Sequence, residues 1–384
     1  MRYTAPFLGL FFIAVWFAPV GPDKIAIFWW MLITTLLYDT GYTIVFLIYS
    51  ALLPELTESE EERNKLSVFA SFFSLLGTII GFLIPDFFRS EQGILPLQMA
   101  MISIGIVGTL LILFTTYKFK ERPEFTRVDE PLKIGNALKF TFKNKSFLVL
   151  VIGNFMSIFI QQMLLGGMFF LADYVVQGSS IILLVALFIP LVLGVWFTPK
   201  LIKKFGVVRT DQILLTIGAT GLLLITFVPP IFMYVSLALA GIGLVGPLVL
   251  TNVMFAQICD EDELKTGVRR EAAYFGMNAF VTKPAQSIAI ALPTLLLTLA
   301  YFVPRKNGII QTQTHPAEVD FAIRAFMGLI PAIALYLEVL ILQLYPLKGD
   351  YLAEVQQKVL VLHQEKRAKL LEMDKKQKPD TDQQ

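Results

Sequence analysis

The sequence has few of the side chains that bind metals or attack substrates. Among its 384 residues are one cysteine, Cys259, and two histidines, His315 and His363. A single cysteine cannot form a disulfide bond within the chain, and this set leaves almost no ligands for zinc. No nucleophile recurs with a base and an orienting group at helical spacing, and there is no phosphate-binding loop. We therefore predict that the protein is not an enzyme and has no cofactor.

Charged residues are also scarce. Asp, Glu, Lys and Arg make up 16% of the chain, against about 25% of an ordinary soluble domain. Hydrophobic residues make up 55%, with 33 phenylalanines, and the mean hydropathy is +0.67. The net charge of +2 is spread over several segments, so we expect no nucleic-acid partner. This composition predicts an all-α polytopic membrane protein embedded in the lipid bilayer.

Long apolar runs are abundant. A bilayer core of about 30 Å requires about 20 apolar residues in a helix, and ten runs approach this length. They cover residues 6–20, 26–53, 67–85, 98–117, 146–172, 180–199, 211–228, 231–254, 273–303 and 319–346. The first run is short and follows Met1-Arg2, so a signal peptide is the alternative there. Because nine spans follow it, we favour a membrane helix.

The distribution of Lys and Arg predicts the orientation, because short cytoplasmic loops carry an excess of them. With the N-terminus inside, the inner segments contain 26 of these residues and the outer loops contain four. We therefore expect both termini in the cytoplasm and the protein in the cell membrane.

The polar segments divide the chain into four parts. We expect an incomplete N-terminal bundle of four spans, a cytoplasmic linker, a C-terminal six-helix bundle, and a cytoplasmic tail that begins as a helix and ends in disorder. These parts are residues 1–117, 118–145, 146–346 and 347–384.

Several motifs resemble those of one transporter family. They are Tyr42 to Thr57 with its Pro-Glu-Leu-Thr end, Glu62-Arg63, Asn144 to Phe147, Asp260 to Glu271, Lys283, and Tyr345 to Leu347. These stretches resemble the glycoside, pentoside and hexuronide cation symporters, the melibiose permease branch of the major facilitator superfamily. The resemblance implies two helix bundles with a substrate site between them near the midplane, and alternating access by rocking of the bundles.

The resemblance also implies that this chain starts at the family's third helix. The first two helices of the family carry acidic residues that bind the coupling Na⁺ or H⁺. Phe46 stands where the family often has Asn or Asp, and Gln257 stands where the family often has an aspartate. The possibility that the solute is less polar than a disaccharide therefore stays open.

Lys283 and Asp39 are the charged residues most deeply placed in their spans. Lys283 lies about ten residues, or about 15 Å, into its helix. A charge there costs a few kcal/mol and normally faces a cavity or a partner. Lys283 also matches an intramembrane lysine of the family that lies by the cation and sugar sites. Asp39 is the candidate proton carrier or charge partner of Lys283. The alternatives are a structural lysine and a carboxyl kept neutral by burial.

Polar and aromatic side chains on two spans complete the candidate pathway. Tyr42 and Tyr49 lie near the Asp39 face and could stack on a sugar ring, although such stripes more often pack helices. Asn154, Ser157 and Gln161 form a polar strip that either lines a cavity or joins helices. Asn278 matches a polar position of the family and is a weaker candidate, and we expect a structural role for Glu338.

The segment from Asp260 to Glu271 mixes charges of both signs between two spans. We expect a loop whose ion pairs with the basic loops at 63–65 and 200–204 close the inner side. Exposed pairs are worth at most about 1 kcal/mol, which suits a gate that must open. A solvated loop is the alternative. The candidate gate residues are Arg63, Asp260, Asp262, Arg269, Arg270 and Glu271.

The sequence thus predicts a secondary transporter. We expect a monomer that moves a small glycoside or related solute by alternating access, coupled to Na⁺ or H⁺. Two alternatives stay open: a membrane remnant that does not transport and serves as a scaffold or sensor, and a carrier of lysolipids.

Overall fold

The protein is helical throughout the part that the structure describes. A computed structural model describes residues 1–19, 24–56, 59–87, 95–118, 141–304 and 311–377. The helices in chain order are α1 (Thr4–Val15), α2 (Lys24–Leu56), α3 (Glu60–Phe87), α4 (Leu95–Lys118), α7 (Lys145–Phe170), η1 (Leu171–Val176), α8 (Ser180–Phe205), α9 (Val207–Phe227), η2 (Pro230–Phe232), α10 (Met233–Thr266), α11 (Glu271–Leu299), α12 (Pro316–Arg324), η3 (Ala325–Leu329), α13 (Ile330–Leu342) and α14 (Gly349–Gln377).

Hydropathy located these helices well. Nine helical segments in the described residues are long and apolar enough to cross a membrane, and each coincides with a predicted span. The exception is the first run, which forms only the 12 residues of α1. That helix is about 18 Å long at about 1.5 Å per residue, shorter than a bilayer core. Most of the predicted linker and the last residues of the tail lie outside the described residues.

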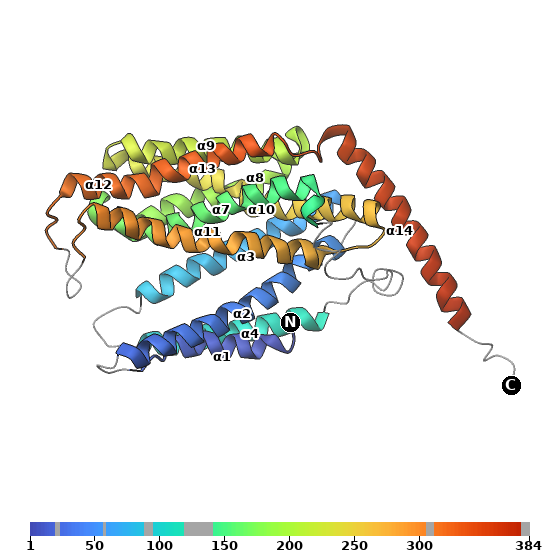
Figure 1. Cartoon of the computed structure of the whole chain (residues 1–384), viewed down its shortest axis with the longest axis horizontal. Helices are drawn as coiled ribbons and strands as arrows, with labels where there is room; N and C mark the ends of the chain where they lie inside the picture. Colours follow the sequence, from blue (N-terminus) through green and yellow to red (C-terminus); the bar gives the residue numbers. More distant parts are fainter. Residues whose placement is uncertain (20–23, 57–58, 88–94, 119–140, 305–310, 378–384) are drawn as a thin grey trace.

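The helices form two groups (Figure 1). The first group consists of α1, α2 and α4, with α1 packed on both of the others. The second group consists of α7 to α13 and contains most of the buried apolar side chains. Helix α3 crosses between them and contacts α8 and α10 more extensively than it contacts α2 or α4. The two groups therefore meet mainly where α2 contacts α11 and α10, while α3 lies between them and packs on the second group.

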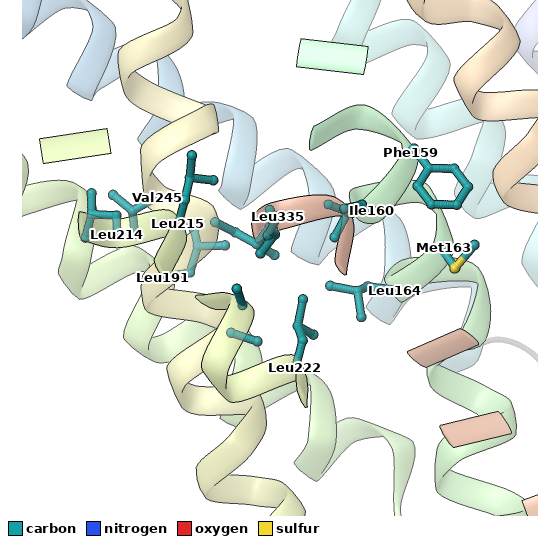
Figure 2. Packing of buried hydrophobic residues seen from close by; sticks show 14 of the residues in the cluster. Phe159, Ile160, Met163, Leu164, Leu191, Leu214, Leu215, Leu222, Val245 and Leu335 are labelled. Atoms are coloured by element: carbon teal, nitrogen blue, oxygen red, sulfur yellow. The ribbon is translucent and has the colours of Figure 1, made fainter. Parts of the chain in front are cut away.

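Close packing holds the second group together (Figure 2). Ile160, Leu215 and Leu335 come from three different helices and are fully buried in one cluster. At the crossing of α9 and α10, a Cβ added to Gly243 would lie 2.2 Å from Gly218 Cα. Small residues let membrane helices approach closely, and the gain in van der Waals packing stabilises their association.

Two glycines end helices where the chain turns sharply. Gly206, with φ of 78°, separates α8 from α9, and Gly267, with φ of 76°, follows α10. Glycine adopts such positive φ values without the clash of a Cβ. Both turns lie at the end of the molecule where α14 packs against α10, and we call this the tail end (Figure 1).

Candidate functional site

An ion pair joins the two helix groups through residues that are distant in the sequence. Lys283 Nζ on α11 lies 2.5 Å from Asp39 Oδ1 on α2. The side chains are 34% and 51% exposed, respectively. Neither side chain is enclosed, and the pair lies at the contact of α2 with α11. The structure thus brings together the lysine and the acid that the sequence singled out as partners.

Aromatic side chains lie beside this pair on α2. The rings of Tyr38 and Tyr42 stack with centroids 6.2 Å apart, and those of Tyr42 and Phe46 stack at 5.7 Å. Tyr42 and Tyr49 are both exposed. The tyrosine stripe therefore presents accessible ring area on the helix that carries Asp39, and only part of it is used in packing within α2.

The polar strip on α7 joins helices. Asn154 Nδ2 donates to Asn278 Oδ1 on α11 at 2.8 Å. The Ser157 hydroxyl lies 2.7 Å from both carboxyl oxygens of Glu338 on α13. Gln161 is half-buried one turn further along α7. For Asn154 and Ser157 the structure supports helix joining, which was one of the two alternatives, and Asn278 lies one and a half turns before Lys283 on α11.

The acidic segment is a helix and not a loop, which corrects our expectation. No glycine or proline occurs between Pro247 and Gly267, so α10 continues through Asp260 to Thr266. The four consecutive acidic residues from Asp260 to Glu263 are buried there against basic side chains. The estimate for exposed ion pairs is therefore wrong for this site, because removing one partner of a buried pair costs about 3–5 kcal/mol.

Asp260 connects α10 to α3 at the tail end. The Arg63 guanidinium on α3 binds the Asp260 carboxylate with two nitrogens, and Nη2 lies 3.2 Å from Oδ1. Further along α3, Ser67 Oγ donates to the carbonyl of Val249 at 2.6 Å and Ser71 Oγ to that of Leu248 at 3.0 Å. This row of contacts, from Arg63 to Ser71, holds α3 against α10 over about two turns of α3.

The other candidate gate residues brace this closure from one side. Arg269 contacts Asp260 at 3.2 Å and Glu263 at 2.7 Å, and also binds Glu271. Arg270 binds Asp262. Burial alone would lower the pKa of the Arg269 guanidinium, but the carboxylates of Glu271, Asp260 and Glu263 raise this pKa well above its usual value. Arg269 is therefore a permanent cation at the centre of the cluster.

The basic residues at 200–204 form the end of α8 and not a loop, and they do not pair with the acidic segment as we expected. Lys203 Nζ lies 3.2 Å from Glu61 on α3, and both side chains are exposed. Glu61 also pairs with Lys65 at 3.4 Å. Because α10 buries its own acids, the nearest accessible carboxylate for Lys203 is the one at the start of α3.

The tail helix contributes residues that the sequence analysis missed. Lys366 Nζ lies 2.8 Å from Glu263 Oε1, and His363 Nε2 lies 2.9 Å from Oε2. Tyr351 donates to Glu261 at 2.8 Å, and burial together with that carboxylate raises the pKa of Tyr351 to about 12. These residues share the face of α14 that buries Val355 and Val359. Extending the apolar pattern along the helix would therefore have found them.

An apolar hollow of about 220 Å³ lies where α3 meets α8. It is near the end of α3 opposite Arg63. All of its lining residues are hydrophobic: Ile79, Leu83, Ile181, Leu184, Val185, Phe188, Ile189, Val192 and Leu193. The hollow can accept an apolar group and offers nothing to a hydroxyl-rich one.

Comparison with solved structures defines the class of fold. A crystal structure of the E. coli fucose:proton symporter FucP matches with a TM-score of 0.61, covering 90% of this chain and 84% of that one at 13% sequence identity. A structure of FucP in the outward conformation matches with a TM-score of 0.62. The protein therefore has the all-α, multi-pass fold of the major facilitator superfamily, as predicted.

The family follows from the sequence. Residues 1–349 match the MFS/sugar transport protein family. The chain belongs to this family of membrane transporters, which confirms the resemblance to melibiose permease-like proteins.

The names of similar proteins point to different substrates, and one name gives no substrate. The chain is 28% identical to the "uncharacterized symporter YjmB" of Bacillus subtilis, over 84% of this chain and 70% of that protein. It is 24% identical to the "glucuronide carrier protein homolog" of Escherichia coli, over 82% and 69%. It is 22% identical to the "sodium-dependent lysophosphatidylcholine symporter 1" of Gallus gallus, over 91% and 72%.

Proposed function

We propose that this chain is a secondary transporter of a small anionic glycoside, such as a glucuronide, coupled to Na⁺ or H⁺. The observation that carries the proposal is the accessible ion pair between Lys283 and Asp39. A sugar carboxylate can replace Asp39 as the partner of Lys283, because both present the same group to the ammonium. The similarity to a glucuronide carrier homolog supports this substrate class.

Coupling follows from the charge balance at this pair. When the solute carboxylate binds Lys283, the Asp39 carboxylate loses its counter-charge within a membrane span. Uptake of one proton or one Na⁺ by Asp39 restores neutrality. Anion and cation then bind together and each favours the binding of the other, which is the requirement for symport.

In this proposal the protein lies in the cell membrane, and the tail end serves as the gate on the cytoplasmic side. Closure there consists of Arg63 with Asp260 and the serine contacts between α3 and α10. Release of solute on that side requires α3 to part from α10, as in rocking of the two bundles.

One observation favours a second candidate, a carrier of lysolipids. The hollow between α3 and α8 is lined only by apolar side chains. It therefore suits an acyl chain. The chain also resembles a lysophosphatidylcholine symporter along most of its length.

Site-directed labelling separates the two candidates. Tyr42→Cys and Leu193→Cys, each in a Cys259→Ser background, place one thiol by the ion pair and one in the hollow. In membranes, glucuronide should slow maleimide labelling at position 42 and leave position 193 unchanged. If lysophosphatidylcholine protects position 193 while glucuronide protects neither, the lysolipid function replaces the proposed one.

A further inference from the structure

Two carboxyls lie buried inside the second helix group. Asp211 on α9 is 1% exposed and Glu338 on α13 is 4% exposed. Both belong to segments long and apolar enough to cross a membrane, and Gln212, next to Asp211, donates from Nε2 to the carbonyl of Val339, next to Glu338, at 3.3 Å. In the described part of the chain, neither forms an ion pair with a basic residue. Two acids in apolar surroundings without a basic partner must be neutralised by bound cations or protons.

The two carboxyls differ in their hydrogen bonds. The Ser157 hydroxyl lies 2.7 Å from both oxygens of Glu338 and donates its one hydrogen to one of them. Asp211 Oδ1 is buried and has no hydrogen-bond partner among the described residues. Leaving such an atom unsatisfied costs about 1–3 kcal/mol. Its lone pairs are thus available to a ligand.

The backbone of α10 approaches the same place. A Cβ added to Gly246 would lie 2.2 Å from Asp211 Oδ1, so only glycine allows this approach. The next residue, Pro247, lies inside the helix and has no N–H. The carbonyl of Gly243 on α10 therefore does not receive the hydrogen bond that another residue at position 247 would donate.

The surroundings keep water away from the carboxyls. Leu214, Val245 and Leu335 are buried together in the packed cluster (Figure 2). Leu214 and Leu335 each lie three residues, about one turn, from one of the two acids. A cation held between the carboxyls would therefore be bound in a medium of low polarity, where charge interactions are strong.

We propose that Asp211, Glu338 and Ser157 form a cation site that binds Na⁺. Oxygen atoms from three helices are the ligands that a hard cation such as Na⁺ prefers. With one carboxyl ionised and the other protonated, one bound Na⁺ makes the site neutral. Asp39 is not part of this site, because its carboxylate is already paired with Lys283.

Thermal unfolding of the purified full-length protein tests the site without any transport. At fixed pH and ionic strength, replacing choline chloride with NaCl should raise the Tm in a saturable way, because a ligand of the folded state stabilises it. The combined variant Asp211→Asn, Glu338→Gln should fold and lose this rise. Glu354→Gln, in an exposed ion pair on α14, should keep it.

Three results would overturn the proposal. They are a Tm that does not respond to Na⁺ in the unmodified protein, a response that survives in the double variant, and a Tm that depends on pH but not on Na⁺. If the double variant does not fold, Ser157→Ala serves instead. It should raise the half-saturating Na⁺ concentration at least about threefold by weakening one ligand, and an unchanged concentration contradicts the site. Loss of glucuronide transport with the Na⁺ response intact would reject the proposed function and leave this site standing.

Discussion

Lys283 and Asp39 are 244 residues apart in the sequence, yet their charged atoms lie 2.5 Å apart across the contact of α11 with α2. An ion pair between accessible side chains is worth at most about 1 kcal/mol. The pair is therefore strong enough to orient both groups and weak enough to be exchanged for a solute carboxylate and a cation.

Asp39→Asn should separate binding from coupling. The amide removes the acid that accepts the cation but leaves Lys283 free for the solute. We expect exchange of labelled glucuronide across proteoliposome membranes at equal concentrations to continue, while accumulation driven by a Na⁺ or proton gradient falls at least about tenfold. Full accumulation by this variant would exclude Asp39 as the coupling residue.

Arg63→Ala should open the tail end. The only cysteine, Cys259, is buried beside Asp260 at this closure, so it reports opening without competing thiols. We expect maleimide to modify Cys259 at least about tenfold faster in Arg63→Ala than in the unmodified protein, which corresponds to about 1.4 kcal/mol of lost closure.

Lys358→Ala is the matched control for that measurement. It removes an exposed pair with Glu354 on α14, away from the closure. Its labelling rate should equal that of the unmodified protein. Equal rates in Arg63→Ala as well would show that the contact of α3 with α10 does not limit access.

Glu263→Gln should destabilise the tail end more than any exposed charge change. Glu263 is fully buried and binds Arg269, His363 and Lys366, so the amide leaves buried cations undercompensated. Breaking such a network costs about 3–5 kcal/mol. We expect a lower Tm and faster proteolysis of α14. Glu354→Gln, in an exposed pair, should change stability by less than about 1 kcal/mol.

Gly243→Ala should test the crossing of α9 and α10. The added Cβ would lie 2.2 Å from Gly218 Cα. Overpacking of this kind costs about 1–3 kcal/mol. Gly276→Ala, where a Cβ meets nothing within 4 Å, is the matched control and should leave the Tm unchanged or slightly higher. Equal Tm values for both variants would contradict the close approach of the two helices.

Much of the fold could be predicted because membrane helices are recognised in a sequence by their length and hydropathy. The extension of α10 through Asp260 to Thr266 was missed because a run of four acidic residues is typical of an exposed loop. Only the basic partners found in the structure explain why these residues are buried in a helix. Those partners lie far away: Arg63 is 197 residues from Asp260, and Lys366 is 103 residues from Glu263. Asp211 was missed for a similar reason, because only the packing of α9 against α13 and α10 buries it.

Gradient-driven uptake of labelled glucuronide into proteoliposomes tests the central claim most directly. With an inward Na⁺ or proton gradient, the unmodified protein should accumulate the solute above its external concentration, and Lys283→Ala should abolish this accumulation. Uptake no greater than in protein-free liposomes under either gradient, with folded and inserted protein, would contradict the assignment of this chain as a glycoside symporter.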